Sequence, residues 1–410
     1  MVTLLALFVG LGSGQQVHAT LTPPPQPLIA GHAWNATLVV RPQPRSAPRL
    51  TARPVTGKQI AFRARRVGHG RYKVRLVLPR TGRWRISARI GRSTKPLRTV
   101  TVSPLPPPTS PLPGGTAFRV CGGARQPYLQ YGLALGFGSA WVACREQGEV
   151  QRIDVTSGQV LAHIRVRASV STVSAGEGAV WAITLGGSTL YRIDPQTNRV
   201  AAEISLGGRV PYLWAGAGAV WAADDDNNAL IRVDPGSNQR VMTVPVGNGA
   251  AGFAFDGSYL WVLNHRENTL DRINPADNVV YRANSAIAPP DTAAAERITF
   301  FGGALWVTGR GIDLLRVSTP DGTVLGQTEI GGGGIAVVSD AANLWMAAAD
   351  ADADRRGDPI ASAVLELDQS GAVTRTVAPT RRLFADGLAA ADGQVWVFDA
   401  VAGLLVRLPA

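Results

Sequence analysis

The first 116 residues contain neither aspartate nor glutamate, although they carry 18 lysines and arginines. All 29 acidic residues lie in residues 117–410, together with 23 arginines and no lysine. Two stretches with such different charge predict two domains, a strongly basic one followed by one with a balance of −6. The absence of lysine beyond Lys95 excludes catalysis by a lysine base or a lysine Schiff base in the second stretch.

Cysteine is also scarce, because Cys121 and Cys144 are the only two in 410 residues. Two cysteines and five scattered histidines cannot build a zinc cluster, and the cysteines are too far apart for a CxxC motif. The sequence has no GxSxG nucleophile motif, no HExxH motif and no phosphate-binding loop. No apolar run reaches the length of a normal membrane span.

The N-terminus has features of a secretory signal. Residues 2–11 are apolar, and the small-x-small triplet at 17–19 predicts cleavage after Ala19, so residues 1–19 are interpreted as a signal peptide. The stretch before the apolar segment lacks lysine and arginine, which leaves an uncleaved anchor as the alternative. Export predicts a secreted or cell-envelope protein and permits one disulfide bond.

Residues 20–103 predict the first domain. After an extended lead-in, short segments alternate arginine or lysine with apolar residues, the period-2 pattern of strands with one buried face. We expect a basic β-sandwich of immunoglobulin (Ig) type. The stretch GRYKVRLVLPRTGRWRISARI resembles small Ig-like domains found beside exported and copper-handling proteins, but their Met and His copper ligands are absent. The Pro-rich stretch 104–115 (PLPPPTSPLPGG) predicts a semi-rigid linker.

Residues 116–410 contain an internal repeat, seen in GSAWVACREQGEVQRIDVTSGQV, GAVWAITLGGSTLYRIDPQTNRV and GAVWAADDDNNALIRVDPGSNQRV. Tryptophans anchor seven copies at spacings of 40, 40, 40, 45, 39 and 51 residues. A repeat near 40 residues made of short strands predicts a β-propeller, here with seven blades, so the whole chain is expected to be all-β. The anchors are Trp141, Trp181, Trp221, Trp261, Trp306, Trp345 and Trp396.

Each copy is expected to form four strands, a to d, from the centre outward. The seventh copy ends at Ala410 without a strand d, and residues 116–121 (TAFRVC) form a strand-like segment with no blade of its own. We expect this segment to close the ring as strand d of the seventh blade. The ends of strands b and d share one face of a propeller, so Cys121 and Cys144 are predicted to form a disulfide bond there.

With Gly-x-x-Trp-Val and Arg-Ile-Asp-Pro repeating, residues 117–410 resemble the YVTN-type repeat propellers, which include the streptogramin (virginiamycin B) lyase-like proteins. The resemblance implies the propeller fold. It also implies a group with lyases, binding scaffolds and members without known activity. The lyases of this group use a histidine base, acidic residues and Mg²⁺, but no residue of that set can be aligned with this chain.

The b–c and d–a loops are expected to form the ligand face. His265 and Glu267 lie in the fourth b–c loop, where a histidine beside a carboxylate is a candidate general base, the alternative being a solvated loop. In the third b–c loop, Asp224, Asp225 and Asp226 are candidate binding residues, although a simple turn with solvated carboxylates is the alternative. Arg266 and Arg310 complete the candidate binding set.

The sixth b–c loop contains alternating aspartates. Asp350, Asp352 and Asp354 could supply oxygen ligands to a Ca²⁺ or Mg²⁺ ion. The loop is not an EF-hand, because Arg355 stands where that motif has Gly and Ala361 stands where it has Glu. A solvated insertion is the alternative, and no cofactor is required by the sequence.

These features favour an exported binding or scaffold protein. The propeller face would bind an unidentified ligand or protein, and the basic domain would dock to an anionic cell-surface polymer or lipid headgroups. Export makes nucleic acid the least favoured partner, and we expect a monomer. A streptogramin lyase-like, metal-assisted lyase or hydrolase and a purely structural envelope protein are the alternatives.

Overall fold

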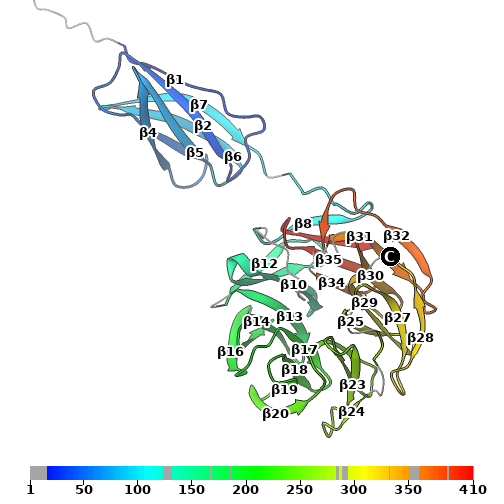
Figure 1. Ribbon diagram of the computed structural model, residues 1–410. Helices are drawn as coiled ribbons and strands as arrows, with labels where there is room; N and C mark the ends of the chain where they lie inside the picture. Colours follow the sequence, from blue (N-terminus) through cyan, green and yellow to red (C-terminus); the bar gives the residue numbers. More distant parts are fainter. Residues whose placement is uncertain are drawn as a thin grey trace, which may run out of the picture. The chain divides into compact units, whose positions relative to one another are not determined.

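The computed structural model describes residues 16–104, 106–122, 132–166, 169–184, 186–282, 286–288, 294–331, 333–350, 360–385 and 387–409. The chain divides into two compact units, Met1–Pro106 and Pro107–Ala410. Regular structure is almost entirely β-strand in both units (Figure 1). Within the described ranges, no helix has the length and apolar character needed to cross a membrane.

The first unit contains seven strands that pair in the order β1-β2-β5-β4-β3-β6-β7. Strand β4 pairs with both β3 and β5, and so it joins the two groups of strands. The seven are β1 (His18–Leu21), β2 (Ala33–Arg41), β3 (Arg49–Pro54), β4 (Ile60–Gly68), β5 (Arg71–Val77), β6 (Gly82–Ile90) and β7 (Ser93–Val102).

The alternation in the sequence becomes alternation of burial in these strands. In β5 the residues Tyr72, Val74 and Leu76 are buried while their neighbours are exposed, since successive side chains of a strand point to opposite faces. The inward side chains form one hydrophobic core around Trp34 and Trp84. The outward positions are therefore left to the basic residues.

Strand β1 was not expected from the sequence, which assigned its first two residues to a signal peptide. His18–Leu21 pairs antiparallel with the C-terminal half of β2, and Leu21 joins the core. The predicted cleavage point after Ala19 lies inside this strand. Cleavage there would remove half of β1.

The second unit is a seven-bladed β-propeller, as the repeat predicts (Figure 1). Blade 1 contains β9 (Leu133–Gly136), β10 (Ser139–Cys144), the 3-10 turn η1 (Arg145–Gln147), β11 (Glu149–Asp154) and β12 (Val160–Arg165). Blade 2 contains β13 (Val170–Gly176), β14 (Ala179–Thr184), β15 (Thr189–Asp194) and β16 (Arg199–Ser205). Blade 3 contains β17 (Tyr212–Gly216), β18 (Ala219–Asp224), β19 (Ala229–Asp234) and β20 (Gln239–Pro245).

The remaining blades follow the same plan. Blade 4 contains β21 (Ala250–Phe255), β22 (Leu260–Asn264), β23 (Thr269–Ile273) and β24 (Val280–Arg282). Blade 5 contains β25 (Ala294–Phe301), β26 (Ala304–Arg310), β27 (Ile312–Ser318) and β28 (Val324–Thr328). Blade 6 contains β29 (Gly334–Ser339), β30 (Leu344–Ala349), β31 (Ile360–Leu367), β32 (Val373–Val377) and the short β33 (Leu383–Phe384).

Blade 7 is built from both ends of the unit. Its first three strands are β34 (Gly387–Ala391), β35 (Gln394–Asp399) and β36 (Leu404–Pro409), and its outermost strand is β8 (Thr116–Arg119). The predicted disulfide is confirmed, with the Cα atoms of Cys121 and Cys144 5.2 Å apart. It links the segment after β8, in blade 7, to the end of β10 in blade 1.

The recurring arginine of strand c holds neighbouring blades together. In blade 1, Arg152 lies opposite Trp141, places its guanidinium 5.2 Å from the ring centroid and donates to the carbonyl oxygen of Pro195 in blade 2. The same kind of bond crosses to the next blade in Arg192 to Asn238, Arg232 to Asn278, Arg272 to Pro320 and Arg407 to Val155. These arginines are therefore part of the scaffold.

Candidate functional site

The aspartates of the third b–c loop differ in environment. Asp224 is buried and accepts hydrogen bonds from the side chain and the backbone N–H of Asn227, at 2.9 and 3.3 Å. Its carboxylate lies against the backbone of Gly208, where a Cβ atom would come within 2.6 Å of it. Asp224 thus stabilises the turn, and its carboxylate is buried.

Asp225 is also buried, and it joins three loops of the propeller. Arg209, in the d–a loop between blades 2 and 3, donates to its carboxylate, and Arg266 of blade 4 donates to it at 3.0 Å. Asp226 is half-exposed and contacts Arg209 at 3.4 Å. The alternative of a turn with three solvated carboxylates is therefore wrong for Asp224 and Asp225, because tertiary contacts bury them.

His265 and Glu267 are close in sequence but do not form an acid–base pair. No hydrogen bond joins their side chains within the described residues. Glu267 accepts a bond from Thr269 at 3.3 Å and so belongs to its own turn. The imidazole of His265 lies on Gly249, whose φ of 78° and absent Cβ allow the ring to approach the backbone.

The carboxylate that acts on His265 comes from another blade. Burial of the imidazole lowers the pKa of His265 and outweighs Glu296 of β25, in blade 5, which is 8% exposed and raises that pKa. The nearby cations Arg266 and Arg310 lower it further. His265 is consequently uncharged near neutral pH, the form that can accept a proton or a metal ion.

Glu296 is itself held by two arginines. Arg310 donates to Glu296 Oε1 through Nε at 3.1 Å and through Nη2 at 3.0 Å. The buried Arg297 lies 3.8 Å from Oε2 and donates to the carbonyl oxygen of Ile335 in blade 6. The charged groups on this face therefore form two sets of ion pairs, one on Asp225 and one on Glu296. Arg209, Arg266 and Arg310 remain about half-exposed.

Most of the sixth b–c loop lies outside the described residues. The backbone N–H of Asp350 donates to the carbonyl oxygen of Ile360 at 2.8 Å. Asp352 and Asp354 lie outside the described residues. In the described part of the chain, no three histidine, cysteine, aspartate or glutamate side chains gather in a way that could hold a metal ion. The metal site remains a prediction.

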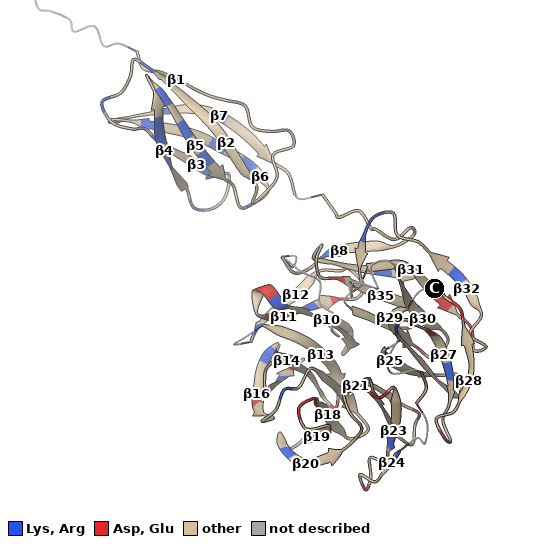
Figure 2. Cartoon of the chain, in the orientation of Figure 1, with Lys and Arg blue, Asp and Glu red and all other residues tan. Residues whose placement is uncertain are grey.

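The first unit carries a second candidate site on its outward face. A hollow of about 630 Å³ lies over β2, β5 and β4 and is lined by Arg63, Arg65, Lys73 and Arg75 together with Asn35 and Thr37. Figure 2 shows lysine and arginine along these strands and no acidic residue in the unit.

Like charges stand directly opposite one another in this unit. Arg49 of β3 is paired with Arg63 of β4 on one side and with Arg89 of β6 on the other, and Arg65 is paired with Lys73. Such pairs are destabilising, and no carboxylate is present to compensate for them. The arrangement favours an external anion as the compensating charge.

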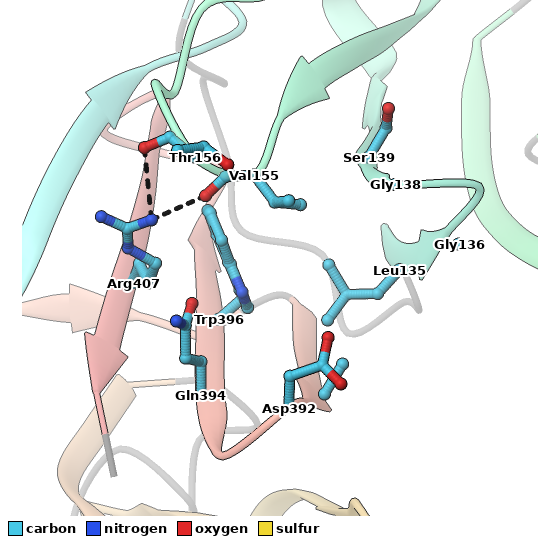
Figure 3. A pocket seen from close by; sticks show the side chains of 11 residues that line it. Leu135, Gly136, Gly138, Ser139, Val155, Thr156, Asp392, Gln394, Trp396 and Arg407 are labelled. Carbon is cyan, nitrogen blue, oxygen red and sulfur yellow. Dashed lines mark hydrogen bonds between the residues drawn. The ribbon is translucent and has the colours of Figure 1, made fainter.

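A further cavity of about 370 Å³ lies between blades 7 and 1, on the side of the a–b and c–d turns (Figure 3). It is at the opposite end of the blades from the loops that the sequence analysis selected. Its polar lining includes Asp392, Gln394 and Arg407, and its apolar lining includes Leu135 and Trp396.

A solved structure that matches this chain with a TM-score above 0.5 supports the fold. The hydrazine synthase of Kuenenia stuttgartiensis matches with a TM-score of 0.54 and 12% identity over 70% of this chain and 98% of that one. Apo AztD from Citrobacter koseri matches with a TM-score of 0.46 and 12% identity over 86% and 89% of the two chains. The sequence matches no protein-family model and no curated protein. At such identities the likeness concerns the fold alone.

Arg209 and Glu296 were not predicted from the sequence, although they pair with the candidate residues Asp225 and Arg310. Arg209 lies in a d–a loop with no repeated motif around it, and Glu296 lies in a strand a between alanines and an arginine. Neither residue lies in a local sequence pattern that predicts a functional role. Their importance arises from the ring, which places blades 3, 4 and 5 side by side.

Proposed function

We propose that this chain is an exported binding protein whose basic first unit docks to an anionic polymer or membrane surface. The observation that carries the proposal is the hollow lined by Arg63, Arg65, Lys73 and Arg75 in a unit without acidic residues. Guanidinium groups bind phosphate and carboxylate through paired hydrogen bonds, and four cations on adjacent strands can act on one chain of anions together.

Export is part of the proposal and is supported by the Cys121–Cys144 disulfide, a bond that persists in oxidising compartments. An Ig-like assignment of the first unit is supported by its strand order. Strands β1-β2-β5-β4 followed by β3-β6-β7 correspond to the order A-B-E-D and C-F-G of seven-stranded Ig sandwiches.

The test measures binding of the full chain to phosphatidylglycerol vesicles, to phosphatidylcholine vesicles and to soluble polyphosphate. We expect binding to both anionic probes, weakening as salt rises, and none to phosphatidylcholine. A variant with Arg63, Arg65, Lys73 and Arg75 changed to Gln should bind roughly two to three orders of magnitude more weakly.

The matched control replaces four exposed arginines of the propeller, and so removes the same amount of charge. It consists of Arg119→Gln, Arg165→Gln, Arg199→Gln and Arg382→Gln. An equal loss of affinity in both variants would assign binding to net charge and refute a docking site on the first unit. Absence of binding by the parent chain would leave the structural envelope role as the better description.

For the propeller, we propose ligand binding on the b–c and d–a loop face, where Arg209, Arg266 and Arg310 each present part of a guanidinium group. A metal-assisted lyase or hydrolase is the second candidate. It is favoured by the lowered pKa of His265, because a general base must be uncharged. Equal activity of the parent and His265→Ala on linear and cyclic esters would remove this candidate.

A further inference from the structure

Within the described residues, the turns between strands a and b form hydrogen bonds between neighbouring blades at two places. At the junction of blades 2 and 3, Glu177 Oε1 accepts from the backbone N–H of Gly218 at 3.0 Å. At the junction of blades 6 and 7, Asp340 Oδ2 accepts from the backbone N–H of Gly393 at 2.9 Å. In both cases, the acidic residue directly after strand a reaches the next blade.

The junction of blades 7 and 1 has the acidic residue but not the bond. Asp392 follows β34 as Glu177 follows β13, and both have left-handed backbone conformations, with φ values of 52° and 51°. The residue that corresponds to Gly218 is Gly138 of blade 1. Asp392 and Gly138 both line the cavity, and no hydrogen bond is formed by either of them in the described structure.

The tryptophan of blade 7, Trp396, also lacks a hydrogen bond that other blades have. In blades 1, 2, 3 and 5 the indole N–H donates to a backbone carbonyl five residues earlier, at 3.0 to 3.3 Å. Within the described residues Trp396 has no such partner, and neither does Trp345, which is sealed in the core. Trp396, by contrast, lines the cavity (Figure 3).

Arg407 and Ser139, two other polar residues of the lining, are already engaged, whereas the side-chain amide of Gln394 forms no hydrogen bond within the described residues. Arg407 donates through Nη1 to the carbonyl oxygens of Val155 and Thr156 at 2.6 and 3.4 Å, and it lies over Trp396. Ser139 accepts a bond from Arg152 at 2.8 Å. The carboxylate of Asp392, an exposed residue, is therefore the acidic group of the lining that forms no hydrogen bond or ion pair within the described residues.

The walls are suited to a small amphipathic molecule. Leu135, Val155 and Ala391 supply apolar surface. The Trp396 ring is covered by Phe118 and Arg407, and only 2% of the residue is exposed. A volume of about 370 Å³ lies within the range of small-molecule sites. Such sites combine apolar walls with a few unpaired polar groups that fix orientation.

We propose that this cavity binds a small organic ammonium compound, with its apolar or aromatic body against Leu135 and Val155 and its ammonium group on Asp392. The carboxylate repels an anion and gives a neutral molecule a weaker hydrogen bond than a cation. The site lies on the propeller alone, and so it does not depend on docking by the first unit.

The experiment compares benzylamine, benzyl alcohol and benzoate, which share one body and differ in charge. Binding to the full chain is measured by calorimetry and by ligand-observed NMR at neutral pH. Benzylamine should bind at least about ten-fold more tightly than either analogue, as expected for a charge-assisted hydrogen bond. Asp392→Asn should remove this preference, and it should fold, because asparagine tolerates a positive φ.

The control is Glu177→Gln, which removes an equivalent carboxylate that is already bonded to Gly218. It should leave the preference for benzylamine unchanged. Equal binding of the three probes, absence of binding, or an unchanged preference in Asp392→Asn would each overturn the proposal. A loss of preference in both variants would also overturn it, since long-range charge would then be the cause.

Discussion

Two of the environments that arginine has in the propeller differ in their role. The strand-c arginines such as Arg232 lie over a tryptophan and reach the next blade, whereas Arg209 and Arg266 share the buried carboxylate of Asp225 in loops. The strand-c arginines recur in the repeat and hold neighbouring blades together. The loop arginines are not part of the repeat, so these residues are where ligand recognition on that face would reside.

Loss of a strand-c arginine should weaken the ring. Arg232→Ala removes a 2.8 Å bond to Asn278 and a cation–π contact with Trp221, and we expect a loss of about 1–3 kcal/mol in the free energy of unfolding. Denaturant unfolding measures it. The exposed Arg199→Ala is the control, and an equal effect of both would contradict the scaffold role.

The buried Asp399 should make stability depend on pH. Burial raises its pKa in the folded state, so the folded state binds more protons than the unfolded chain and stability falls as pH rises through that window. The Tm of Asp399→Asn minus the Tm of the parent should therefore increase as the pH is raised from about 3 to about 7.

Asp234→Asn should show the opposite trend. The hydroxyl and backbone N–H of Ser237 lower the pKa of Asp234, and its stabilisation is present above the unfolded pKa and lost as pH falls through the folded one. The variant should then be less stable than the parent at neutral pH and equal to it in acid. Parallel trends for Asp399→Asn and Asp234→Asn would refute the assignments.

At the scale of elements, the closing strand β8 decides how the ring is sealed. It supplies the outer edge of blade 7 by pairing Thr116–Arg119 with β36, so that this edge is not left open. The side chain of Phe118 occupies the space where any residue other than glycine at 158 would place its Cβ. The disulfide then fixes the segment after β8 to blade 1.

Removal of the disulfide should destabilise the propeller. Closing a loop with a sequence separation of 23 is worth about 3 kcal/mol in the chain-entropy description, so Cys121→Ala with Cys144→Ala should lower the Tm by roughly 5 °C or more. Calorimetry measures it, and mass spectrometry without reductant checks the parent. Two free thiols in exported protein, or an unchanged Tm, would contradict this role.

At the scale of the whole molecule, the chain consists of two units with separate cores. All buried members of the core around Trp34 and Trp84 belong to the first unit, and the propeller buries its tryptophans in clusters of its own. Charge is divided in the same way, because the acidic residues belong to the propeller. The stability and the ligand binding of one unit should therefore be measurable separately from those of the other.

Calorimetry of the full chain should accordingly resolve two unfolding transitions. Reductant should lower the transition of the propeller alone, since both cysteines belong to it. Polyphosphate should raise the transition of the first unit alone, because a ligand stabilises the unit that binds it. A single transition that responds to both additions would show that the units unfold together.

The sequence by itself determined the all-β class, the seven blades and the disulfide partners, because the repeat, the tryptophan spacing and the cysteine positions are local or periodic patterns. It could not assign burial to Asp224 and Asp225 or bring Glu296 to His265, since those contacts join loops from different blades. The open junction at Asp392 and Gly138 was equally hidden, because the tertiary structure alone decides which turns meet and which hydrogen bonds they form.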